Sequence, residues 1–324
     1  MIGRPSWQKK EACTLFKLSF SASAPGSMML LGEHAVLHGY SALVAAVNYR
    51  MHVRLSLRKD GQVVIDSALG QFESPLKNMS IQAPFTFVLT AIDYYKDALS
   101  GVDLSIQSDF SHQVGLGSSA AVTVAVVAAM RKALGLDLSL NAIFHDAYEV
   151  VSLVQGVGSG ADVAASVFGG LGCYRMAPFY YKHLKNIPRV FLYYSGSKMP
   201  TVEVIKHVES TFENRKDELA AIYKGIDACV TAAKTAIDFS DWRHLGKLFA
   251  QQQNLMDQLG VNNDALQSLV DVLSRQKKVK GVKISGSGLG DCVIALGRLQ
   301  KASSLQSDRY IPVEIVKQGV VINE

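Results

Sequence analysis

The chain has 324 residues, 48% of them hydrophobic, and a formal net charge of +5. A chain of this size can form a large core, and at roughly 150 residues per domain it is expected to fold as two domains. Its 19% content of charged residues and its 26 glycines fit a folded α/β enzyme better than a disordered chain. The modest positive charge favours the approach of an anionic substrate without identifying it.

The sequence disfavours several classes of binding partner. The basic clusters at 9–10 and 275–280 are short and lack interleaved aromatic residues, so we expect no nucleic-acid partner. The run 120–130 is shorter than the ~20 residues of a membrane span, and charged residues interrupt any signal-peptide core at the N-terminus. Four scattered cysteines without a CxxC pair indicate reduced thiols. We expect a cytoplasmic protein with no membrane partner, and a homodimer is left open.

Hydrophobic periodicity divides the chain into helices and strands. In the first half it predicts strands over 14–26, 41–58, 62–67 and 102–109, and helices over 83–99, 118–134 and 141–155. In the second half it predicts a strand over 189–196, helices over 201–216, 217–237, 242–259 and 264–276, and strands over 281–288, 291–297 and 313–322. This order predicts an α+β protein with an N-terminal domain over 1–184 and a C-terminal domain over 185–324.

The first polar motif lies at 23–40, where Glu33 and His34 interrupt an apolar stretch. His34 and His38 have the spacing of zinc ligands on a helix. A metalloprotease helix, however, places its glutamate between the histidines, whereas Glu33 precedes both, so zinc is disfavoured. The alternative is a connection between two elements that contains a satisfied polar pair.

The second motif, "VGLGSSAA" at 114–121, is a glycine turn that leads into a helix. Free N–H groups and the helix dipole favour an anion at such a helix start, and a serine hydroxyl can add contacts or bind Mg²⁺. No Gly-Lys-Ser/Thr follows, so this is not a Walker A loop. A plain turn, a dinucleotide fingerprint from Gly115 to Ala120, and a nucleophile elbow at Ser119 stay open as alternatives.

Two further stretches could carry chemistry. Asp162 follows a Gly/Ser loop and precedes a segment of small apolar residues, which suits a general base or, alternatively, a helix N-cap. The segment 283–292 contains a second glycine-rich loop with Gly286, Ser287 and Gly288 between two predicted strands. Two such loops are harder to explain as simple turns than one.

Taken together, these motifs resemble those of the GHMP kinase superfamily of small-molecule kinases, and within it the mevalonate kinases. The resemblance rests on 23–39, 112–125 and 283–297, which occur in the family's order, and on 158–170, which resembles the loop carrying the catalytic aspartate. It implies a GHMP kinase fold, with an N-terminal domain like domain 2 of ribosomal protein S5 and a C-terminal ferredoxin-like domain. The active site would lie between the domains.

The resemblance also implies that ATP phosphorylates the 5-hydroxyl of mevalonate with Mg²⁺ as the metal cofactor. Asp162 would accept the proton of that hydroxyl. The residues implied in binding the ATP phosphates are Gly115, Leu116, Gly117, Ser118, Ser119 and Ala120, of which Ser118 or Ser119 would also bind Mg²⁺. The residues implied near the acceptor substrate are Glu33, His34, Ser159, Gly160, Gly286 and Ser287.

Two positions depart from the family pattern. Mevalonate kinases usually carry a lysine directly after the Pro-Gly of the first motif, where this chain has Ser27, and a Mg²⁺-binding glutamate where it has Val151. Glu149 lies two residues away and therefore points to a nearly opposite side of a helix. These departures leave phosphomevalonate kinase, a sugar kinase and a non-catalytic metabolite sensor as alternatives.

Overall fold

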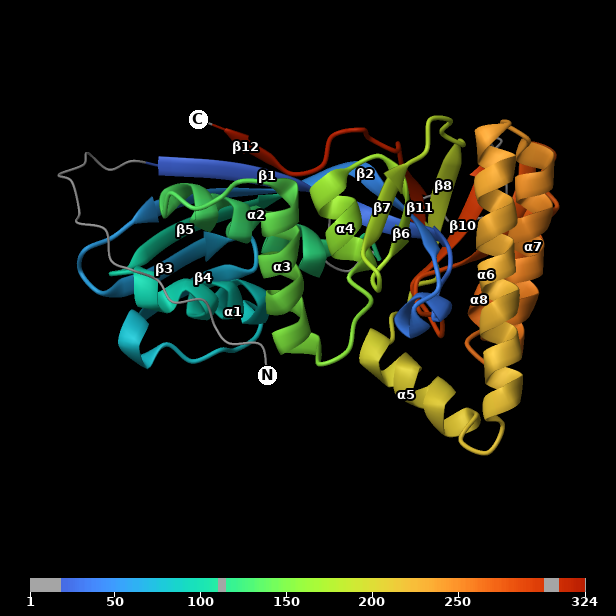
Figure 1. Cartoon of the computed structure of the whole chain (residues 1–324), viewed down its shortest axis with the longest axis horizontal. Helices are drawn as coiled ribbons and strands as arrows, with labels where there is room; N and C mark the ends of the chain where they lie inside the picture. The colour runs from blue at the N-terminus through green and yellow to red at the C-terminus, as the bar shows by residue number, and fades with distance from the viewer. Residues whose placement is uncertain (1–18, 110–114, 300–308, 324) are drawn as a thin grey trace.

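The computed structural model describes residues 19–109, 115–299 and 309–323, whose helices and strands form two units, each built on one sheet (Figure 1). The larger sheet has the order β12-β1-β2-β5-β3-β4, and β6 pairs with both β2 and β7. Its strands are β1 (Ser19–Leu31), β2 (Ala42–Leu57), β3 (Gln62–Ser67), β4 (Gly70–Pro75), β5 (Val102–Ser108), β6 (Leu171–Arg175), β7 (Tyr180–His183) and β12 (Val321–Asn323). The β3–β5 pair is parallel and the other pairs of this sheet are antiparallel.

Helices of the first unit pack together on this sheet. They are α1 (Thr86–Tyr95), α2 (Ser118–Ala133), α3 (Leu140–Gln155) and α4 (Ala161–Phe168), and three short 3-10 turns are η1 (Ala35–His38), η2 (Leu76–Asn78) and η3 (Lys96–Ala98). Both α2 and α4 contact β1 and β2. The alanines and valines of α2 are almost all buried, because small side chains let a helix approach a sheet closely.

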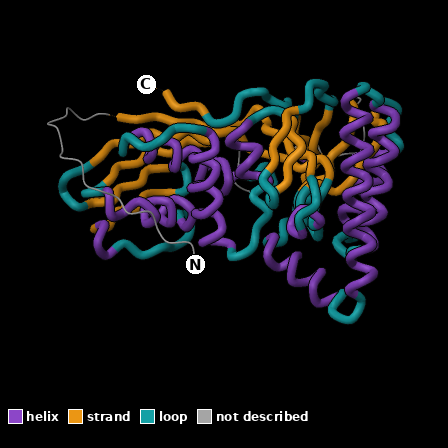
Figure 2. The backbone as a smooth tube through the Cα atoms, in the orientation of Figure 1, coloured by secondary structure: helices purple, strands orange, loops and turns teal. Residues whose placement is uncertain are grey.

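The second unit is a four-stranded antiparallel sheet with the order β11-β8-β10-β9. Its strands are β8 (Val190–Tyr194), β9 (Val279–Ser285), β10 (Cys292–Gly297) and β11 (Tyr310–Pro312), and its helices are α5 (Thr201–Thr211), α6 (Lys216–Asp238), α7 (Trp242–Gln258) and α8 (Asp264–Ser274). Helices α6 and α7 lie side by side at one end of the molecule (Figures 1 and 2), and α6 also contacts β1 and β2 of the larger sheet. Helices α7 and α8 pack on β9.

The structure corrects two of the expected strands. The first strand was expected to end at 25–26, but β1 continues to Leu31 because register shifts around Pro25 and Met29 let its pairing with β2 resume. The expected strand 313–322 is not one strand. The short strands β11 and β12 flank this segment, and β11 pairs with β8 whereas β12 pairs with β1. Residues 14–18 of the first expected strand lie outside the described residues.

The end of the chain therefore returns to the sheet in which it began (Figure 1). A bridge between Val47 and Ile315 lies on the same return path. The two units are thus joined by the segment that follows β7 and by this returning segment. The domain boundary between residues 184 and 185 stays a prediction.

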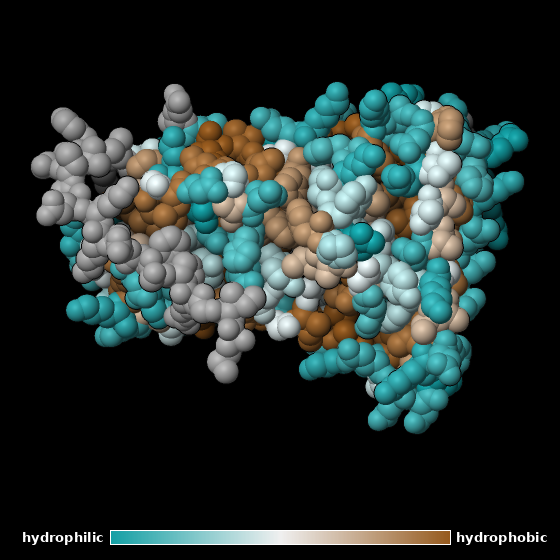
Figure 3. Space-filling model, viewed as in Figure 1, coloured by the Kyte–Doolittle hydropathy of each residue, from teal (hydrophilic) through white to brown (hydrophobic). Residues whose placement is uncertain are grey.

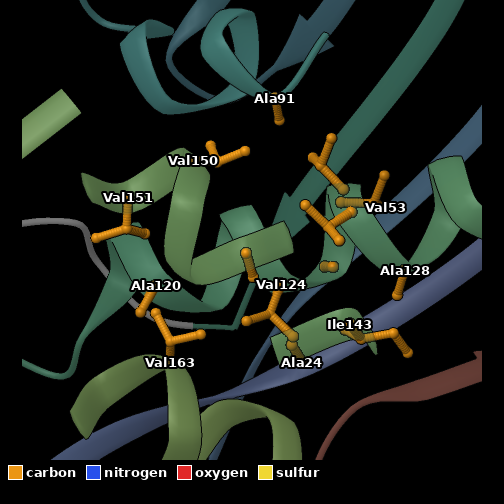
Figure 4. Packing of buried hydrophobic residues seen from close by; sticks show 14 of the residues in the cluster. Ala24, Val53, Ala91, Ala120, Val124, Ala128, Ile143, Val150, Val151 and Val163 are labelled. Carbon is orange, nitrogen blue, oxygen red and sulfur yellow. The ribbon is translucent and has the colours of Figure 1, made fainter. Parts of the chain in front are cut away.

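Helices α2, α3 and α4 pack against one another and share one hydrophobic cluster. Figure 4 shows Ala120, Val151 and Val163 among the buried side chains of this cluster. Val151 is 8% exposed and belongs to the core, as expected from its place in the apolar stripe of α3. On the surface, hydrophilic residues cover most of the edge formed by α6 and α7 (Figure 3). No helix among the described residues is both long and apolar enough to cross a membrane.

Candidate active site

A pocket of about 210 Å³ lies where the four predicted motifs meet. Segments from both units line it, including the last residues of β1, the start of α2 and the loop between β9 and β10. The predicted site residues that line it are Glu33, His34, Gly115, Gly117, Ser118, Ser119, Ala120, Ser159, Gly160, Asp162, Gly286 and Ser287. Leu116, which was also predicted, does not line the pocket, because its side chain is buried in the hydrophobic cluster between the two units.

The glycine turn before α2 is held tightly against its neighbours. The carbonyl of Leu116 accepts a hydrogen bond of 2.9 Å from the Ser27 N–H, and Gly117 is the left-handed N-cap of α2. A Cβ atom on Gly117 would lie 2.0 Å from Ser27 Oγ, and one on Gly115 would lie 1.8 Å from Asp291 Oδ1. Close contact therefore favours glycine at both positions, and the left-handed backbone conformation favours it at Gly117 as well.

The family resemblance implies that this turn binds ATP, so replacing Gly117 with alanine is expected to weaken ATP binding at least about tenfold, or ~1.4 kcal/mol. The new Cβ must displace Ser27 or move the start of α2, whose first residues line the pocket. Gly135→Ala is a matched control because Gly135 follows the other end of α2, has a similar φ of 65°, and has no atom within 4 Å of its added Cβ. Calorimetric titration with ATP compares the two variants, and equal losses of affinity would contradict the proposed steric cause.

Asp162 lies in the first turn of α4, with its carboxylate open to the pocket. Gly160, in the left-handed conformation, is the N-cap of α4, so Asp162 is not the cap that was considered as its alternative role. Ser27 Oγ donates a hydrogen bond of 2.8 Å to Asp162 Oδ1. The surrounding protein raises the pKa of Asp162 above its ordinary value by desolvation, while the Ser27 bond and the charge of Lys198 lower it.

Glu33 is committed to a buried ion pair between the two units. Its Oε1 accepts a hydrogen bond of 2.5 Å from the Lys283 ammonium group, and its Oε2 accepts one from the Gln252 amide. Glu33 is 2% exposed and Lys283 is 0% exposed. Burial raises the pKa of Glu33 and lowers that of Lys283, and their attraction opposes both shifts. With both carboxylate oxygens occupied, Glu33 joins the first motif to β9.

His34 makes a second link of this kind. Its Nε2 forms a hydrogen bond of 2.8 Å with the carbonyl of Ser287, and this carbonyl makes Nε2 the donor. The backbone of His34 has a positive φ of 61°, which the turn before η1 requires. The first motif and the loop between β9 and β10 are therefore fixed relative to each other next to the pocket.

Two pocket residues were not named from the sequence as site residues. Asp291 follows the glycines of the third motif and has a positive φ of 68°, and its Oδ1 is buried without a hydrogen-bond partner. Burial raises the pKa of Asp291, and Lys198 opposes this shift. Lys198 lies between β8 and α5 and lines the same pocket. The Asp within "GSGLGDC" was a visible signal for Asp291, whereas no local pattern marked Lys198.

Comparisons with known proteins identify the family of this chain. Residues 86–170 match the GHMP kinases N terminal domain, residues 229–309 match the GHMP kinases C terminal domain, and residues 14–57 match the galactokinase galactose-binding signature. A mevalonate kinase of Archaeoglobus fulgidus is 32% identical over 94% of this chain and 99% of its own length. The chain belongs to the GHMP kinase family. A mevalonate kinase of Pyrococcus furiosus is 30% identical to this GHMP kinase over 94% of this chain and 98% of its own length.

The structural similarity confirms the expected fold class of this GHMP kinase. The L. major mevalonate kinase in complex with R-mevalonate has a TM-score of 0.71 and 24% identity, over 87% of each chain. The expected α+β GHMP kinase fold is therefore confirmed. The chain is an ATP-dependent small-molecule kinase, and kinases of this class use ATP with Mg²⁺.

Proposed function

We propose that this GHMP kinase transfers the γ-phosphoryl group of ATP to the 5-hydroxyl of mevalonate, with Asp162 as the general base. The observation that carries the proposal is the placement of Asp162 in one pocket with the glycine turn of α2, where a hydroxyl and a triphosphate can meet. The similarity of nearly the whole chain to mevalonate kinases supports mevalonate as the acceptor.

The reaction needs little covalent participation from the protein, so positioning and charge complementarity supply most of the catalysis. The N–H groups at the start of α2 bind the ATP phosphates, and Ser118 and Ser119 add hydroxyl contacts. The acceptor oxygen forms a bond to the γ-phosphorus as the bond between that phosphorus and the ADP oxygen breaks. Asp162 takes the hydroxyl proton, and Ser159, Gly160, Gly286 and Ser287 surround the acceptor beside His34.

The donor set of the pocket fits Mg²⁺, although Val151 occupies the position of the family's glutamate. Ser118 and Ser119 offer hydroxyl oxygens, and Asp291 offers a carboxylate oxygen without a hydrogen-bond partner. Mg²⁺ prefers such oxygen ligands and takes few of them from protein. We propose that these three residues hold the ion, which neutralises phosphate charge when it is bound.

A coupled assay of ADP release tests the acceptor. Mevalonate should support turnover, while phosphomevalonate and galactose should give no more than the background rate. Galactose belongs in this panel because residues 14–57 match a galactose-binding signature, which makes a sugar kinase the second candidate. If ADP is released with phosphomevalonate or galactose but not with mevalonate, then mevalonate is not the acceptor. The reaction would still be phosphoryl transfer from ATP to a small molecule.

The pH dependence of kcat is expected to report Asp162. Only the ionised carboxylate can accept a proton, so kcat should fall as the pH decreases through the pKa of Asp162. Because that pKa is raised above its ordinary 3.8, the fall should begin at a higher pH than for a solvent-exposed aspartate. Ser27→Ala removes a hydrogen bond to the charged form and should move the midpoint up by about one pH unit.

The profile is measured with both substrates saturating, so that kcat and not binding is followed. Ser100→Ala, at an exposed position, is the matched control and should leave the midpoint in place. A Ser27→Ala midpoint that stays constant or moves down would show that the hydrogen bond does not favour the ionised carboxylate.

A further inference from the structure

The glycine turn before α2 lies directly against the carboxylate of Asp291 and, through Ser27, next to that of Asp162. Gly115 faces Asp291 Oδ1, and Gly117 faces Ser27, whose hydroxyl donates to Asp162. Both aspartates line the pocket that receives an anionic nucleotide. Like charges in a partly desolvated site repel one another, so a nearby protein cation would stabilise this arrangement before the nucleotide and its metal ion bind.

The family pattern would supply that cation directly after Pro25-Gly26, but this chain has Ser27 there. Among the pocket-lining residues in the described ranges, Lys198 is the one lysine or arginine. Its positive charge favours the ionised form of Asp162. Lys198 comes from the second unit, more than one hundred residues after Ser27 in the chain.

The backbone around Lys198 is fixed to the loop that carries Asp291. The Asp291 N–H donates to the Ser197 carbonyl at 2.7 Å, and the Ser195 N–H donates to the Asp291 carbonyl at 2.8 Å. A Cβ atom on Gly290 would lie 2.9 Å from the Ser197 carbonyl oxygen and 3.2 Å from Lys198 Cα. Glycine at 290 therefore permits the close approach of the Lys198 backbone to the Asp291 loop, and Lys198 lines the same pocket as both aspartates.

We propose that Lys198 is the positioning cation of this active site, supplied by the β8–α5 connection in place of the lysine that the family carries after Pro-Gly. Lys198 balances the charges of Asp162 and Asp291 and keeps Asp162 placed to receive the acceptor's proton. This inference rests on the proposed role of Asp162, but not on mevalonate being the acceptor.

A double-mutant cycle on thermal unfolding tests the charge balance without any substrate. Asp162→Asn is measured in the wild type and in Lys198→Met, without nucleotide and at about pH 8, where ordinary carboxyl groups are ionised. Without Lys198, Asp162 and Asp291 repel each other unopposed, so Asp162→Asn should raise Tm by at least about 2 °C more in the Lys198→Met background. Lys206→Met, an exposed lysine on α5, should give no such coupling.

Steady-state kinetics tests the positioning role. Lys198→Met should lower kcat by about 100-fold while the acceptor KM changes less than about threefold, and Lys198→Arg should recover at least about tenfold of the loss. The kinetics use whichever acceptor supports turnover of the wild type. Lys206→Met should keep the wild-type kcat.

Each negative result would overturn a different claim. An absent coupling between Lys198 and Asp162 in the unfolding cycle would overturn the inference whatever the acceptor is. A rise in acceptor KM with unchanged kcat would also overturn it and assign Lys198 to acceptor binding. A wild type that turns over another acceptor but not mevalonate would overturn the proposed substrate and leave the cycle to decide on Lys198.

Discussion

Asp162→Asn is expected to lower kcat by about 1,000-fold, because general-base catalysis typically contributes 10²–10⁴. The amide has nearly the shape of the carboxylate and can still accept a hydrogen bond from Ser27, but it cannot accept the hydroxyl proton at neutral pH. ATP affinity should stay within about threefold of wild type, since its proposed contacts come from the start of α2. ADP release and ATP titration measure the two quantities separately.

The control is Asp66→Asn, an exposed carboxylate on β3 far from the pocket in the sheet. It should retain wild-type kcat. An Asp162→Asn enzyme with more than about a tenth of the wild-type rate would exclude Asp162 as the general base. A wild type that binds ATP but releases no ADP with any acceptor would instead favour the metabolite sensor.

Lys283→Met is expected to lower the free energy of unfolding by about 3–5 kcal/mol, because it leaves the Glu33 carboxylate buried without its counter-charge. Glu33 and Lys283 lie 250 positions apart and join the first motif to β9, so both units should be affected. The double variant Glu33→Gln/Lys283→Met removes both charges and should recover most of the stability. Denaturant unfolding measures all three proteins.

Lys280→Met is the matched control, since Lys280 is exposed on the same strand. Its free energy of unfolding should change by less than about 0.5 kcal/mol. The same series decides the role of Glu33, which the family resemblance places near the acceptor. If Glu33→Gln raises the acceptor KM and leaves stability unchanged, Glu33 binds substrate and the buried pair is not its main role.

Local patterns in the sequence were sufficient for most of the helices. The small apolar run at 118–134 and the stripe at 141–155 predict α2 and α3 to within a residue or two, because helical periodicity depends on neighbouring residues. The helix α4 and strands β4, β6 and β7 were not predicted. Each is at most eight residues long, and such short segments acquire their structure mainly from tertiary packing.

The sequence by itself determined the family, the glycine turn before α2 and the aspartate after the Gly/Ser loop. These features depend on residues close together in the chain, where steric limits on backbone conformation and the start of a helix act locally. The tertiary structure decided which distant polar side chains come together: Glu33 pairs with Lys283, Ser27 bonds to Asp162, and Lys198 lines one pocket with Asp162 and Asp291. It also decided that the chain end returns to β1. Electrostatic and sheet-pairing partners are chosen by proximity in space, which spacing along the chain does not encode.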